Sequence, residues 1–256
     1  MTSVVKRIEG YQKVYLLSED RRQIARIQDA TLHTEDYGVL SEHGLFGSAE
    51  WWAAIDRGDL PTHTVRGTIC ALLMEGMNDW PVFRILTEDG SVTESITREA
   101  SPGTSELYQI GSRVIWRYVE TRHKKQISGL PETQQMTIEI WAGDTVKLYR
   151  PVGPDELKLI VNSGFSCFPP RLPEQPIFYP VCSFEYAAEI ASRWNVKDSG
   201  RGYVTTFEVD KYYLDQYEVH QAGNKGHQEY WIPAESLNDF NSHIVGKIQA
   251  LKSFPD

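Results

Sequence analysis

The fold of the first half of the chain is decided by the stretch PVFRILTEDG, residues Pro81–Gly90. Its first seven residues form a short alternating run with the period of a half-buried β-strand. Glu88, Asp89 and Gly90 follow this run and separate it from the next, which is typical of a hairpin turn. The stretch therefore predicts one arm of a β-hairpin.

Similar runs lie on both sides of this stretch, separated by Gly, Asn, Asp and Pro. They cover Thr68–Met74, Glu106–Ile110, Arg113–Tyr118 and Met136–Trp141. Several short strands at this spacing predict a small, strongly curved sheet or barrel, similar in shape to an oligonucleotide-binding or SH3-like barrel.

Helices are predicted in front of these strands. After a short strand over Lys13–Leu17, Ser18 provides an N-cap for a helix with an acidic first turn. A second helix is predicted over Ser48–Arg57, where Ser48 is the cap and Gly58 ends the helix.

The polar segment Thr121–Gln135 contains Gly129 and Pro131 and predicts an exposed loop or linker. A domain boundary is therefore expected between residues 130 and 146. We place a β-rich, barrel-like domain at residues 1–143 and a second domain at residues 144–256.

The second domain is predicted to be a compact α+β domain. Its expected elements, in chain order, are a strand at Val146–Arg150, a helix at Pro154–Asn162, a strand at Ile177–Val181, a helix at Ser183–Trp194, and strands at Gly202–Val209 and Tyr230–Pro233. The chain as a whole is thus predicted to be α+β.

Composition limits the class of protein. A formal charge of -9 argues against a surface that coats nucleic acid or adsorbs to membranes. Cys70, Cys167 and Cys182 are too few and too scattered for a disulfide framework, and no signal-peptide run or membrane span occurs, so a cytoplasmic protein is expected. The seven histidines lack zinc-site spacing, so no metal site is expected.

One carboxylate interrupts an otherwise aromatic strand near the C-terminus, His227–Pro233. An extended chain directs Tyr230 and Ile232 to one face and Glu229 and Trp231 to the other. Because a carboxylate beside an indole is costly to bury without partners or a function, Glu229 is the first candidate for chemistry.

Three segments, Leu148–Arg150, Phe178–Tyr179 and the Glu229 strand, resemble in order and spacing the motifs of the ADP-ribosyltransferase superfamily. The segment from Leu148 to about Ile248 is similar to small bacterial ADP-ribosylation proteins. The resemblance covers the C-terminal part of the chain and leaves the N-terminal domain unassigned.

The resemblance implies a toxin-like transferase that cleaves the nicotinamide–ribose bond of NAD, its substrate, and passes ADP-ribose to a protein, a nucleic acid or a small molecule. Glu229 would be the catalytic carboxylate on the ribose, and electrostatic groups of this kind are worth about 3 kcal/mol in the transition state. The residues implied to bind NAD are Arg150 as the cation, Tyr179, Phe178 and Tyr186 as aromatic walls, and Arg171 on a covering loop.

Plainer interpretations stand beside these roles. Glu229 would lie in solvent or pair with Lys225, Arg150 would form a buried salt bridge with Glu156 or Asp155, and Tyr179 would be a core residue. The same domain would alternatively hydrolyse NAD with water as acceptor, or bind a nucleotide or nucleic acid without catalysis. Basic residues interleaved with aromatic ones offer a separate nucleic-acid contact through Arg113, Arg117, Arg122, Lys124 and Lys125.

Overall fold

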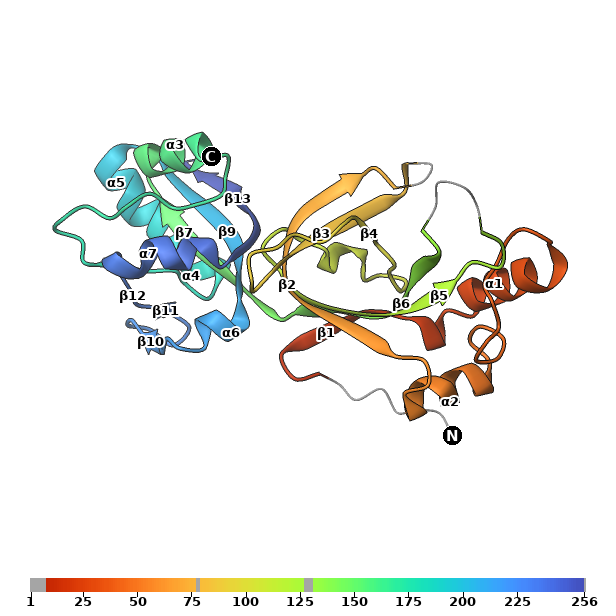
Figure 1. Ribbon diagram of the computed structural model, residues 1–256. Coiled ribbons are helices and arrows are strands. Elements are labelled where there is room, and N and C mark those ends of the chain that lie inside the picture. Colours follow the sequence, from red (N-terminus) through yellow and green to blue (C-terminus); the bar gives the residue numbers. More distant parts are fainter. Residues whose placement is uncertain (1–7, 77–78, 127–130, 256) are drawn as a thin grey trace. The chain divides into compact units, whose positions relative to one another are not determined.

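The computed structural model describes residues 8–76, 79–126 and 131–255 (Figure 1). The chain forms two compact units. Unit 1 consists of the residues up to Tyr108 together with Arg113–Ala142, and unit 2 consists of Gln109–Ser112 together with the residues from Gly143 onward. Each unit has its own hydrophobic core.

Unit 1 is built on a six-stranded sheet with the strand order β1-β6-β5-β2-β3-β4. The strands are β1 (Tyr11–Leu16), β2 (Thr62–Met74), β3 (Pro81–Thr87), β4 (Ile96–Thr97), β5 (Arg113–Arg122) and β6 (Thr133–Gly143). Bulges interrupt β2 between Ile69 and Ala71 and β6 between Thr137 and Glu139, which increases the local twist. The result is a curled, antiparallel half-barrel sheet within an α+β protein. The predictions of an α+β chain and of a strongly curved sheet are confirmed.

Two helices accompany the sheet of unit 1, α1 (Arg21–His33) and α2 (Ala49–Arg57). The α2 prediction is confirmed, because Ser48 Oγ accepts a hydrogen bond from the Trp51 backbone N–H at 3.3 Å. The predicted cap of α1 is wrong by two residues. Asp20 Oδ1 accepts from the Gln23 N–H at 3.0 Å, and Ser18 lies in a preceding 3-10 turn, η1 (Leu17–Glu19).

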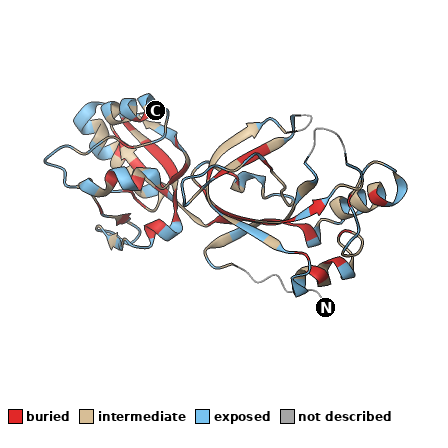
Figure 2. Cartoon of the chain, in the orientation of Figure 1, coloured by how far each residue is buried: buried red, intermediate tan, exposed pale blue. Residues whose placement is uncertain are grey.

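The core of unit 1 is rich in aromatic side chains from both the helices and the strands. Phe46 and Trp51 pack in a tilted pair with ring centroids 4.8 Å apart, and Phe83 and Trp116 are buried with them. Figure 2 shows buried positions following the strands, while the helices keep exposed outer faces. This is the distribution expected of amphipathic helices covering a half-buried sheet.

Two predictions for unit 1 are wrong. The expected strand Glu106–Ile110 is instead the 3-10 turn η3 (Ser105–Leu107) followed by residues that belong to unit 2. The expected linker Thr121–Gln135 is wrong at both ends, where Thr121–Arg122 and Thr133–Gln135 belong to β5 and β6, which pair as far as Arg122 and Thr133. Its residues 127–130 lie outside the described part of the chain. The polar composition of this segment reflects exposed strand ends.

Unit 2 contains a three-stranded antiparallel sheet with the order β13-β9-β7. Its strands are β7 (Thr145–Val152), β9 (Gly202–Asp210) and β13 (Ile244–Phe254). Two short pairs accompany it, β10 (Val219–Gln221) with β11 (Gln228–Tyr230), and β8 (Ile177–Phe178) with β12 (Ile232–Pro233). Strand β13 has no counterpart in the sequence prediction, since register shifts after Val245 and Ala250 break its alternation.

The helices of unit 2 are short. They are α3 (Pro154–Asn162), α4 (Phe184–Ile190), α5 (Val196–Ser199), α6 (Lys211–Leu214) and α7 (Leu237–Ser242), with a π-helical turn η4 (Ala191–Asn195) between α4 and α5 and a 3-10 turn η5 (Ala234–Ser236) before α7. Helix α3 has the predicted bounds, with Pro154 in its first turn. Among the described residues, no helix has the length and apolar character needed to cross a membrane.

Gly67 lies where β2 pairs with β3 and β5 at once, opposite Thr87 and Val114. A Cβ atom at this position would collide with the carbonyl oxygen of Leu86. We expect Gly67→Ala to lower the free energy of unfolding by more than about 2 kcal/mol, because the strands must separate to admit the methyl group. Chemical denaturation of the full chain measures this. The exposed β2 substitution Thr64→Ala is the control and should change stability by less than about 0.5 kcal/mol; equal effects of both substitutions would contradict the close approach.

Candidate functional site

Glu229 is buried in strand β11 of unit 2, with only 8% of its surface exposed. The hydroxyl of Tyr186 donates to its Oε2 at 3.2 Å, and the indole Nε1–H of Trp231 donates to its Oε1 at 2.9 Å. The adjacent Tyr230 packs against the core instead, so the predicted alternation of the strand is confirmed. The interpretation that placed Glu229 in solvent or beside Lys225 is wrong.

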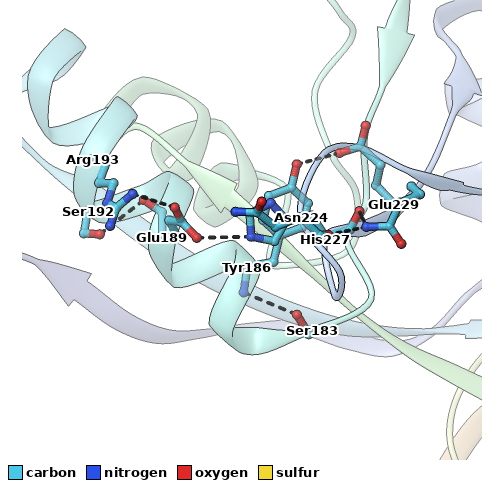
Figure 3. Close-up of polar contacts among 9 residues, drawn as sticks. Ser183, Tyr186, Glu189, Ser192, Arg193, Asn224, His227 and Glu229 are labelled. Carbon is cyan, nitrogen blue, oxygen red and sulfur yellow. Dashed lines mark hydrogen bonds and ion pairs between the residues drawn. The ribbon is translucent and has the colours of Figure 1, made fainter.

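Aromatic rings and histidines surround this carboxylate. His227 stacks on Tyr186 with ring centroids 4.2 Å apart, and its Nε2 lies 3.2 Å from Oε2 of Glu189 on α4 (Figure 3). His220, on the paired strand β10, stacks on Trp231 at 4.1 Å. The two neutral donors of Glu229 are thus each held in place by a stacked imidazole ring.

The negative charge of Glu229 affects the groups that touch it. Burial, and then the charge of Glu229, raise the pKa of the Tyr186 hydroxyl to about 12. The same two causes raise the pKa of the Cys182 thiol. Both groups therefore remain protonated at neutral pH, and Tyr186 acts as a hydrogen-bond donor to the carboxylate.

Arg150 lies on β7 and is also buried, with 6% of its surface exposed. Its Nε and NH2 groups donate to the two carboxylate oxygens of Glu156 on α3 at 2.7 and 3.2 Å, and NH1 donates to the Tyr179 carbonyl at 3.2 Å. The guanidinium carbon lies 4.4 Å from the ring centroid of Phe178. The salt bridge from strand to helix, one of the two sequence interpretations of Arg150, is present.

A cleft of about 330 Å³ brings three of the predicted residues together. It is lined by Arg150, Pro151, Tyr179, Val181, Ile190 and Glu229. Val181 bridges β7 and β11 through Tyr149 and Glu229, which explains why two segments distant in sequence face the same space. Two apolar residues of this lining, Val181 and Ile190, were not predicted from the sequence.

The remaining predicted residues lie behind or beside this cleft. Phe178 is fully buried and packs on Phe168 with ring centroids 4.9 Å apart, so it supports Arg150 from the core side. Tyr186 contacts the carboxylate of Glu229 but does not line the cleft. Arg171 is half-buried, and burial followed by repulsion from Arg150 lowers the pKa of its guanidinium. Its buried Nε has no hydrogen-bond partner among the described residues.

Unit 1 has a larger, open groove of about 880 Å³ beside α2. Its lining includes small residues, among them Gly44, Ala49 and Ala53, here called the floor, and longer charged side chains, among them the carboxylates of Glu42, Glu50 and Asp59, here called the rim. Arg57 is the basic residue of the rim and pairs with Asp59 at 2.8 Å. The sequence of this segment predicts only a helix, because the carboxylates of the rim come together only when the loop before α2 is folded beside it.

The basic residues of the predicted nucleic-acid contact have partners within unit 1. Arg117 on β5 pairs with Glu139 on β6 at 2.6 Å, and Arg122 pairs with Glu42 at 3.2 Å and lies 3.5 Å from Glu132. These cations are already neutralised by neighbouring carboxylates, so they offer little to a phosphate backbone.

The other three basic residues also contact groups within unit 1, and one of them pairs with a carboxylate. Lys124 donates to the backbone carbonyl of Thr31 at 2.6 Å, and Lys125 pairs with Asp36 at 2.5 Å. Arg113 lies over the ring of Tyr11 and donates to its hydroxyl at 2.9 Å. The basic run therefore ties β5 and the segment after it to the rest of unit 1.

Comparison with known families defines the class of protein. Residues 8–142 match the model of a family described as an immunity protein, and this segment is more than half of the chain. The chain belongs to the RhsI2 immunity protein family. No curated protein matches the chain.

This membership overturns the predicted function. An immunity family points to a protein that is not an enzyme, so the ADP-ribosyltransferase assignment is wrong, and with it the roles of NAD as substrate and of an ADP-ribose acceptor. The NAD glycohydrolase and the nucleotide- or nucleic-acid-binding module gain no support either. NAD as a cofactor stays a prediction. The matched segment ends before β7, so the residues that carried the resemblance lie outside it.

The pair Arg150–Glu156 gives a testable consequence for stability. Glu156→Gln keeps the shape of the side chain but leaves a buried guanidinium without a charged partner, so we expect a loss of about 3 kcal/mol in the free energy of unfolding. Urea titration of the full chain measures the loss. Asp155→Asn, at an exposed position in the same first turn of α3, is the matched control and should cost under about 1 kcal/mol. A loss no larger than that of the control would show that the ion pair contributes nothing.

Proposed function

We propose that the protein is a non-catalytic antagonist that binds and neutralises its cognate Rhs toxin. The observation that carries this proposal is the match of residues 8–142 to the RhsI2 immunity protein model. A protein that protects by binding needs an accessible recognition surface, and it does not need a reaction centre. Unit 1 lies within the matched segment, so it is the part from which we expect recognition.

The groove beside α2 is the surface of unit 1 that best suits this role. Three carboxylates and one guanidinium stand on its rim, and the chain carries a formal charge of -9. Glu42 forms an ion pair with Arg122, and Asp59 forms one with Arg57. Glu50 has no ion-pair partner among the described residues. A basic surface on the toxin would complement this rim and be drawn to it by long-range attraction.

The floor of the groove favours close contact. Gly44, Ala49 and Ala53 present little more than backbone, so a partner side chain can approach without displacing bulky neighbours. Gly44 has a left-handed backbone, with φ of 93°, and a Cβ atom there would lie 2.8 Å from Cβ of Glu50. The loop and the helix are thus held close together before any partner arrives, which reduces the ordering cost of binding.

Co-expression tests the function directly. We expect bacteria that express the cognate Rhs toxin to grow when the full chain is co-expressed, and the two proteins to co-purify in equimolar amounts. Because the chain acts by occupying the toxin, protection should disappear when the toxin is in excess. Protection by the chain at amounts far below those of the toxin would indicate catalytic detoxification, and no protection at equal expression would contradict the immunity assignment.

Charge reversal tests the location of the binding surface. We expect Glu50→Lys to weaken the affinity for the toxin at least about tenfold, because it places a cation where a basic partner approaches. Asp56→Lys makes the same charge change on the same helix at an exposed position that does not line the groove, and should change the affinity less than about threefold. Calorimetric titration at two salt concentrations measures both, with thermal melts to confirm folding. Equal effects of the two reversals would place the interface elsewhere.

A further inference from the structure

We propose that the cleft of unit 2 is a binding site for an organic cation, a guanidinium or an alkylammonium group, with Glu229 as its counter-ion. The cleft lies in a part of the chain that the family match does not cover. The inference is therefore independent of toxin neutralisation and rests on the groups that face this space.

The charge of Glu229 is not balanced by an ion pair within the described part of the chain. Its carboxylate is buried, and its two hydrogen bonds come from the neutral Tyr186 hydroxyl and the neutral Trp231 indole. It forms no ion pair with any residue that the structure describes. A carboxylate has about four acceptor positions, so two remain for a ligand. A buried charge without a counter-ion is costly, and a bound cation would offset that cost.

Two other ionisable residues, one lining the cleft and one stacked on Tyr186, have partners of their own. Arg150 also lines the cleft, but its N–H groups already donate hydrogen bonds to both carboxylate oxygens of Glu156 and to the Tyr179 carbonyl. His227 lies against Glu189, which also holds Arg193 at 2.7 Å. The guanidinium of Arg150 is thus balanced inside the protein, whereas the carboxylate of Glu229 is not, and this difference favours a cation over an anion.

An exposed aromatic surface lies beside the carboxylate. Tyr179 is 38% exposed and Trp231 is 43% exposed, and their rings meet edge to face with centroids 6.2 Å apart. Large aromatic side chains left open to solvent next to a carboxylate form the surroundings that bind guanidinium and alkylammonium groups through cation–π contact. Such rings have no comparable attraction for an anion.

The size of the cleft limits the ligand. About 330 Å³ is at the lower end of the range for small-molecule sites, so a single arginine-like group fits and a large ligand does not. Val181 and Ile190 provide an apolar wall suited to the methylene stem of such a group. The cation would come either as a free small molecule or as a basic side chain of a protein, and both present the same chemistry to Glu229.

Titration of the full chain with N-acetyl-arginine methylamide tests the site. The readout is the indole N–H resonance of Trp231, assigned by Trp231→Phe, because this N–H is bonded to the carboxylate that the cation would contact. We expect a saturable shift with the arginine compound and none with the equivalent citrulline compound, which has the same shape without the charge. A longer arginine-containing peptide that binds more tightly would indicate a protein source, and equal affinity a free small molecule.

Three substitutions make the test specific. Glu229→Gln should weaken binding at least about tenfold, and Tyr179→Leu, at a position that is 38% exposed, about threefold to tenfold. Glu235→Gln makes the same change at an exposed carboxylate outside the cleft and should leave the affinity unaltered. If Glu229→Gln fails to fold, Tyr179→Leu carries the test. Equal binding of the citrulline compound, unchanged affinity in Tyr179→Leu, or binding of NAD with no response to the arginine compound would each overturn the proposal.

Discussion

The hydrogen bonding of β2 on both of its edges is the constraint on which unit 1 depends. Around Gly67 this strand pairs with β3 on one side and with β5 on the other, and the absence of a side chain allows the backbones to meet. The bulges in β2 and β6 then bend the sheet. The curvature creates a concave space that Phe46, Trp51 and other side chains of the helical segments fill, so the position of α2 and of its groove follows from the path of β2.

Local signals in the sequence were reliable where a helix has its own start and stop. Ser48 and Gly58 define α2, and Pro154 with the acidic turn that follows defines the start of α3, because these residues act within one turn of the backbone. Non-local features were not predictable in this way. The partners of Arg117 and Arg122 lie on other segments, and the bulges of β13 break its alternation, so a basic patch was expected that is in fact neutralised and a long strand was missed.

The candidate site shows the same limit for function. Arg150, Tyr179 and Glu229 do line one cleft, as their order in the sequence indicated. Their convergence does not make an enzyme, because Arg150 already has Glu156 as its partner and the family match lies in the other unit. Short motifs place residues in a fold, whereas the role of each residue depends on which charges remain unbalanced after folding. By that criterion Glu229 is a buried carboxylate of unit 2 that has no ion-pair partner among the described residues.

The four residues Gln109–Ser112 lie between strands of unit 1 in sequence but belong to unit 2. There the carbonyl of Ile110 accepts a hydrogen bond from the Gly246 N–H of β13 at 2.8 Å, and Gly111 approaches the Ile244 carbonyl. The chain therefore passes from one unit to the other three times. No single cut yields both units intact, since a fragment that begins at Gly143 would lose the segment that satisfies Gly246. An exchange of the C-terminal unit, by evolution or by engineering, must therefore include this short insertion as well. Because of these four residues, the two halves of the gene cannot be exchanged independently.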